Sequence, residues 1–224
     1  FNTSTVPTNW RRFVAANTRW GPIHCNNHVI CAIDVRTGGV NPERADLLEI
    51  CFLPVNHSFQ ISKDFSMFHL KFRPVWPVDK KYAQVSQEVL DEHKMSIFDS
   101  ARGFEMFERW FTDTLQMKQY KKIMPLVWNY ETVRPWLKNW MGDFGFEHHI
   151  HENYRDCMSL LNWWNDRHAY FGEEVPYKHP TFGQLVTRSG VTLLGRNSVP
   201  ANCKALVECY HHMVKDYVPA QGMR

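Results

Sequence analysis

The chain has 224 residues, which suits one domain, and 44% of them are hydrophobic, enough for a sizeable core without a metal or disulfides. A net charge of +3 permits nucleic-acid binding without requiring it. The six cysteines form no CxxC pair and several lie in apolar runs, which excludes a zinc-ligand pattern and indicates a reducing compartment. No apolar stretch approaches the roughly 20 residues that span a bilayer. The first residues also lack a signal-peptide pattern, so we expect a cytoplasmic protein without membrane contact.

Polar residues 1–27 predict an N-terminal arm, and residues 28–224 predict one α/β domain. Apolar runs predict strands at 28–34, 46–55, 66–72 and 123–128, the first two joined in a hairpin by the Gly38-Gly39 turn. Helical periodicity predicts a short helix after Ser86 and further helices at 100–118, 135–141, 154–164, 181–185 and 201–218. This order is typical of a mixed sheet flanked by helices.

Three segments carry a family resemblance. The first strand and its turn read AIDVRTGGVNP (32–42), and the next strand begins LLEI (47–50). This pattern resembles the opening of the DnaQ-like 3′→5′ exonucleases of the DEDDh group, where Asp-x-Glu-Thr-x-Gly ends the first strand. LVWN (126–129) with Val133 and Leu137, and GRNSVPANC (195–203), are similar to the third and last motifs of that group. The resemblance covers about 30–218 and implies a ribonuclease H-like three-layer α/β fold.

Within the group, the length and the segment 154–161 look most like the exonuclease A enzymes of T-even phages. This likeness implies a phage protein that acts in the host cytoplasm.

In active members of the group, four carboxylates hold two divalent metals and a histidine takes the proton of the attacking water. The corresponding positions here are, in order, Asp34, Arg36, Val133, Arg196, and either Ala201 by strict spacing or Asn202 with one inserted residue. Only the first acid is kept. The resemblance therefore implies a degenerate site without catalytic residues, without a metal and without a cofactor.

The two arginines have two interpretations. A guanidinium beside Asp34 would neutralise a buried carboxylate or hold a phosphate with two hydrogen bonds. The alternative is that Arg36 and Arg196 are solvated side chains at a lost active site. Glu131 is a weak candidate for a displaced third acid, and Asp156 fits a helix-start acid better than a metal ligand.

Other residues invite a ligand reading. Aromatic and basic residues alternate at 9–13, 120–122 and 162–168, as in proteins that bind single strands by stacking and phosphate contacts. The competing interpretations are core packing for the tryptophans of 162–168 and a disordered or oligomer-forming arm for 9–13. The histidines of 148–151 and 211–212 are expected at the surface, because adjacent side chains diverge and do not chelate.

We therefore predict a non-catalytic protein that binds RNA or single-stranded DNA. The expected contact residues are Arg36, Arg196, Trp10, Arg11 and Arg12. One alternative is a divergent, metal-dependent 3′→5′ exonuclease whose ligands are displaced. The other is a protein-interaction or inhibitor module that has a protein partner and no nucleic acid.

Overall fold

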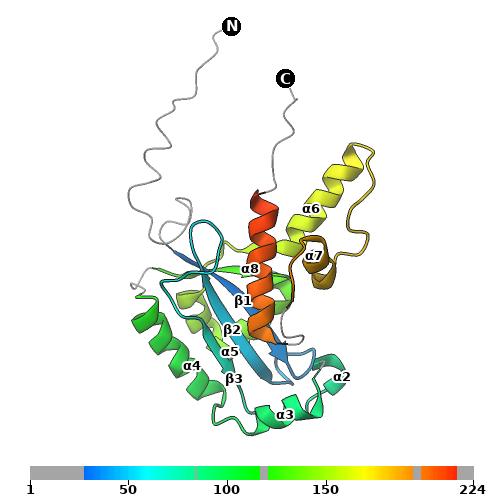
Figure 1. The fold of residues 1–224 in the computed structure, drawn as a ribbon. Helices are drawn as coiled ribbons and strands as arrows, with labels where there is room; N and C mark the ends of the chain where they lie inside the picture. Colours follow the sequence, from blue (N-terminus) through cyan, green and yellow to red (C-terminus); the bar gives the residue numbers. More distant parts are fainter. Residues whose placement is uncertain (1–27, 84, 117–120, 194–197, 216–224) are drawn as a thin grey trace.

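A computed structural model describes residues 28–83, 85–116, 121–193 and 198–215 (Figure 1). The strands are β1 (Val29–Thr37), β2 (Leu47–Val55), β3 (Phe68–Lys71), β4 (Ile123–Val127) and β5 (Arg155–Asp156). The helices are α2 (Lys80–Ala83), α3 (Gln87–Lys94), α4 (Ser100–Arg109), the π-helical turn η2 (Trp110–Thr114), α5 (Tyr130–His149), α6 (Cys157–Tyr170), α7 (Phe182–Arg188) and α8 (Val199–Lys215).

The five strands form one mixed sheet in the order β3-β2-β1-β4-β5. β1 and β2 pair antiparallel, as the hairpin prediction required, and β3 continues the antiparallel half. β4 joins β1 in parallel and β5 joins β4 in parallel. β1 is thus the central strand, along which the antiparallel half of the sheet meets the parallel half.

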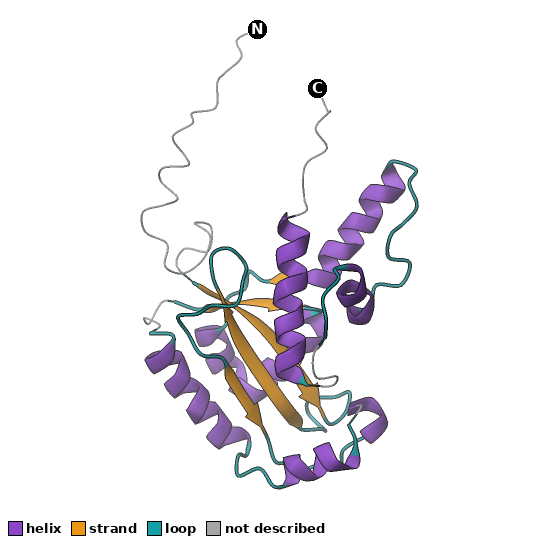
Figure 2. Cartoon of the chain, viewed as in Figure 1, coloured by secondary structure: helices purple, strands orange, loops and turns teal. Residues whose placement is uncertain are grey.

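Helices cover both faces of the sheet, which makes three layers (Figure 2). Alternate residues of β1 serve the two cores: Val29, Cys31 and Ile33 pack with α4, η2 and α5. Ile30 and Ala32 face the opposite way and pack with α6, α7 and α8. Because side chains alternate along a strand, Asp34 follows Ala32 on the α8 face. The α/β, ribonuclease H-like prediction is confirmed.

The start of α5 differs from the sequence prediction, which placed it near Pro135. The helix begins at Tyr130, where the backbone N–H donates to the side chain of Asp156, 3.1 Å away. Another oxygen of Asp156 accepts from the N–H of Met158 at 2.9 Å and so caps α6. One carboxylate therefore caps two helices, and its partner at Tyr130 lies 26 residues away in the sequence.

Two further predictions need correction. The segment 100–118, expected as a single helix, forms α4 followed by the π-helical turn η2, which ends at Thr114. His149 is not a surface residue, because it is buried among aromatic side chains. Its ring packs edge to face against those of Phe104, Phe107 and Phe111. No helix in the described part of the chain is long and apolar enough to cross a membrane.

Candidate nucleic-acid interface

Asp34 lies in the carboxyl-terminal half of β1 and Asn202 in the first turn of α8. The start of α8 lies beside this part of β1 (Figure 1). The side-chain amide of Asn202 donates a hydrogen bond to Oδ2 of Asp34 at 2.9 Å, across 168 residues of sequence. The first and last motifs of the sequence therefore lie together. The contact is made by Asn202, one of the two residues considered for the position of the last acid.

Burial raises the pKa of Asp34 to about 6. The hydrogen bond from Asn202 is the largest opposing cause, and the positive charge of Arg36 also favours the ionised carboxylate. These causes do not compensate for the loss of water around the group. Asp34 thus exchanges a proton close to neutral pH, far above the ordinary range of an aspartate.

Arg36 is not paired directly with Asp34, in contrast to one of our two interpretations. Its Nη1 donates to Oε2 of Glu49 at 2.8 Å, and Oε1 of Glu49 lies 2.8 Å from Nε2 of His69. Both ends of the Arg36–Glu49 pair are nearly inaccessible, with side chains 10% and 2% exposed. For Arg36, this burial also contradicts the other interpretation, a solvated side chain, whereas Arg196 lies outside the described residues. Glu49 was missed, although it lies directly opposite Arg36 in the register of the hairpin.

A cleft of 360 Å³, here called the Asp34 cleft, opens above these residues. Its lining residues are Asp34, Val35, Arg36, Thr37, Tyr82, Ala83, Thr132, Val199 and Asn202. α5 contributes Thr132, whereas Val133, the aligned third-acid position, is buried in the core of the opposite face. Glu131 is exposed on the first turn of α5 and does not line the cleft.

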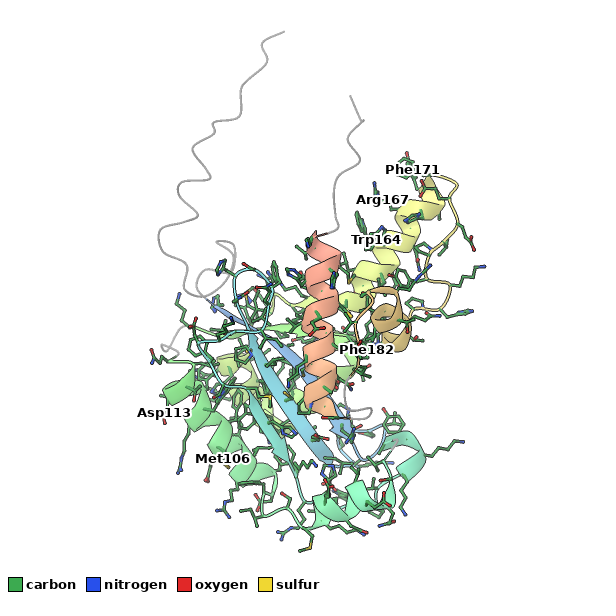
Figure 3. The ribbon with its side chains drawn as sticks, in the orientation of Figure 1. Met106, Asp113, Trp164, Arg167, Phe171 and Phe182 are labelled. Carbon is green, nitrogen blue, oxygen red and sulfur yellow. The ribbon has the colours of Figure 1, made fainter. Side chains whose placement is uncertain are left out.

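A smaller pocket of 210 Å³ shares Asp34 and Asn202 with the cleft. Its other walls are apolar, and two of them are the rings of Trp128 and Phe182, whose centroids lie 5.8 Å apart. Phe182 comes from the start of α7 and points toward α8 (Figure 3). We call this the aromatic pocket. The planes of its two rings are 55° apart, so each ring offers its own face to a flat ligand.

Two divalent metals, which the family resemblance implies for active relatives, do not fit the residues of this cleft. Asp34 is the one carboxylate among the described residues that line it. Magnesium and manganese require several oxygen ligands. Across the described ranges, no group of three or more histidine, cysteine, aspartate or glutamate side chains is arranged to hold a metal.

Four of the predicted contact residues, Trp10, Arg11, Arg12 and Arg196, lie outside the described residues. In the 162–168 stretch, Trp164 packs against the α8 core and Trp163 is 46% exposed. The core interpretation therefore applies to Trp164 but not to its neighbour.

No model of a known protein family matches the sequence, and neither does any curated protein. Solved structures do match in fold. Cell-death related nuclease 4 (CRN-4) gives a TM-score of 0.60 at 13% identity, over 84% of this chain and 64% of that one. E. coli exonuclease I, in complex with a dA13 oligonucleotide, gives 0.60 at 12% identity over 84% and 40%. The nuclease domain of 3'hExo, a DEDDh family member bound to rAMP, gives 0.54 at 14% identity over 84% and 92%.

These likenesses establish a fold shared with CRN-4, exonuclease I and the nuclease domain of 3'hExo. The chain spans less than two thirds of CRN-4 and of exonuclease I. At 12–14% identity the comparisons describe architecture and leave the activity to be argued from the site.

Proposed function

We propose that this protein binds RNA or single-stranded DNA in the Asp34 cleft and the aromatic pocket without hydrolysing it. The observation that carries the proposal is the hydrogen bond between Asn202 and Asp34. The amide occupies one of the lone-pair sites of the Asp34 carboxylate, and, being uncharged, it cannot replace a second carboxylate as a metal ligand. The cleft is open, but the described residues that line it include one carboxylate, Asp34, where two metal ions would need several.

The cleft and the pocket offer complementary parts of a nucleotide site. Trp128 and Phe182 supply flat apolar surface for a base. Thr37, Tyr82 and Thr132 add hydroxyl groups around the cleft, which can bind sugar or phosphate oxygens. Exonuclease I with its oligonucleotide and 3'hExo with rAMP bind such ligands on the same architecture, which supports the assignment of the ligand class.

Arg36 contributes to this site as a hydrogen-bond donor, because Glu49 already balances its charge. It lines the cleft, and its fixed partner Glu49 holds the guanidinium in one position. We also propose contacts with the nucleic acid by Arg196, Trp10, Arg11 and Arg12. The phage origin and the cytoplasmic location are likewise proposals.

The test is fluorescence anisotropy with labelled RNA and single-stranded DNA, together with a hydrolysis assay in magnesium and manganese. We expect binding without digestion. Phe182→Ala should weaken binding by about tenfold, the cost of one lost stack, whereas Phe182→Tyr should bind like the unaltered protein. Digestion that disappears in Asp34→Ala would instead demonstrate a working nuclease. Absence of binding to either nucleic acid at low salt would refute the proposal as a whole.

One observation supports a second candidate, a protein-binding surface on α6. The far end of this helix projects from the body of the molecule and carries Arg167 and Phe171 (Figure 3). Tyr170 is 84% exposed and Phe171 is 47% exposed, with the Arg167 guanidinium 5.9 Å from the Phe171 ring centroid. Tyrosine and arginine are typical of interface hot spots. If α6 is this surface, Tyr170→Ala should abolish capture of a protein partner while nucleic-acid affinity is unchanged.

A further inference from the structure

A second hollow, separate from the Asp34 cleft, runs along α5 on the β5 side of the sheet. This α5 groove has a volume of 760 Å³, and its lining includes Tyr130, Arg134 and Lys138 at helical spacing. At 100° per residue these side chains share one flank of α5. Thr132 lies 200° from Tyr130 by the same rule and lines the Asp34 cleft on the other flank. The two hollows are therefore distinct surfaces of one helix.

Two histidines present hydrogen-bond donors to the α5 groove. The backbone N–H of Lys122 donates to Nδ1 of His28 at 2.8 Å, and that of Asn153 donates to Nδ1 of His151 at 2.9 Å. A neutral imidazole that accepts at Nδ1 carries its hydrogen on Nε2. Burial lowers the pKa of both rings, so they are neutral at pH 7. Both rings line the groove and lie edge to face with centroids 4.5 Å apart.

Charged groups of both signs surround the two rings. After burial and the neighbouring His151, the charges of Lys121 and Lys122 further lower the pKa of His28. After burial, the largest effect on the pKa of His151 is the raising effect of the Glu152 charge, which the charges of Lys122 and Arg155 oppose. Lysines beside a pair of neutral donors can bind a negatively charged group.

The remaining charged groups of the α5 groove carry both signs. Arg134 adds another cation near the ring of Tyr130. Glu147 and Glu152 also line the groove, and like Arg134 both are exposed. Lys138 is held by Asp143 at 3.0 Å, so Lys122 and Arg134 are the lining cations that we assign to a ligand.

An aromatic platform lies beside these donors. The rings of Tyr130 and Tyr154 are stacked, with centroids 4.0 Å apart and planes 24° from parallel. Tyr130 is buried, whereas Tyr154 is 44% exposed. One face of Tyr154 is thus held by the protein and the other is open to stack with a base.

We infer that the α5 groove is a second binding site for single-stranded nucleic acid, in which His28, His151, Lys122 and Arg134 bind phosphate groups and Tyr154 stacks with a base. The ligand class rests on the proposed function, but the surface lies outside the Asp34 cleft. The combination of fixed donors, cations and an exposed ring corresponds to the two components of single-strand recognition.

The test measures anisotropy of a labelled oligonucleotide of about 20 nucleotides, long enough to occupy one such site, over a range of salt concentrations. Arg134→Gln should lower affinity and reduce the slope of log affinity against log salt by about 0.7, the effect of one phosphate contact on a single strand. Tyr154→Ala should lower affinity about tenfold with an unchanged slope, and Tyr154→Phe should restore it. Arg73→Gln is the matched control, because Arg73 is exposed just beyond β3, at the opposite edge of the sheet.

The unaltered protein supplies an independent measurement. Addition of the oligonucleotide should shift the imidazole NMR signals of His28 and His151. Addition of the same volume of buffer without oligonucleotide should not. If Phe182→Ala weakens binding while Arg134→Gln and Tyr154→Ala bind normally, the groove inference is refuted and the proposed function stands. If the protein binds no oligonucleotide at all, both fail. If these two variants lose a protein partner instead, the groove is a protein interface and the inference is equally refuted.

Discussion

Replacing Asp34 with asparagine should stabilise the protein, and the gain should depend on pH. The folded protein holds Asp34 with a pKa of about 6, against an ordinary value of 3.8. Between these values the native state keeps a proton that the unfolded chain has lost, so stability falls as pH rises through this window. At 1.36 kcal/mol for each pKa unit, the ionised group costs about 3 kcal/mol above pH 6. Because the cleft leaves part of Asp34 exposed, we expect about 2 to 3 kcal/mol.

Asparagine resembles the protonated aspartate and can still accept from Asn202. Asp34→Asn should therefore gain about 2 to 3 kcal/mol at pH 8 and roughly half of that at pH 5. Urea denaturation at both pH values measures the difference, with the exposed Asp64→Asn as a control of equal charge change. A gain that is equal at both pH values, or a loss of stability at pH 8, would refute the assignment of Asp34 as a desolvated carboxylate.

Three further substitutions test the charged and capping contacts. Asn202→Asp places a second carboxylate beside Asp34, so the melting temperature should fall at pH 8 and recover toward pH 5, in thermal denaturation scans at the two pH values. Glu49→Gln leaves Arg36 buried without its counter-ion and should cost about 3 to 5 kcal/mol in urea denaturation; the double variant Arg36→Met/Glu49→Leu should recover most of this loss. Asp156→Ala removes the caps of α5 and α6 and should cost about 2 kcal/mol by the same assay, and Asp156→Asn much less. Equal stability of Asp156→Ala and Asp156→Asn would contradict the capping role.

Hydrophobic periodicity was sufficient for most of the fold. The buried runs of β1, β2 and β4 and the helical repeats of α4 and α8 are visible in the sequence, because burial on a regular element imposes a period. β5 was missed because two residues carry no period. The burial of His149 was missed because its neighbours in the core come from α4 and η2 and not from its own helix.

The candidate site was only partly predictable. The resemblance placed the last motif near Asp34 but left Ala201 and Asn202 both open as the residue that reaches it, and the structure has Asn202 in contact with Asp34. Pairing of Arg36 with Glu49 depends on strand register, which a bulge between Arg36 and Thr37 shifts by one residue. Directly opposite residues in a hairpin interact most strongly, so the pair was accessible once the register was known.

The double cap at Asp156 makes the first turns of α5 and α6 one cooperative unit. The amide of Tyr130 donates to this carboxylate, and the amide of Met158 donates both to the same carboxylate and to the carbonyl oxygen of Trp128, which lies just before α5. Opening of the first turn of α5 therefore disturbs the hydrogen bonds of both amides. The first turn of α5 also carries Thr132 on one flank and Tyr130 on the other. Fraying at this single aspartate would therefore loosen the walls of both hollows together, and hydrogen exchange at the two amides should follow one common rate.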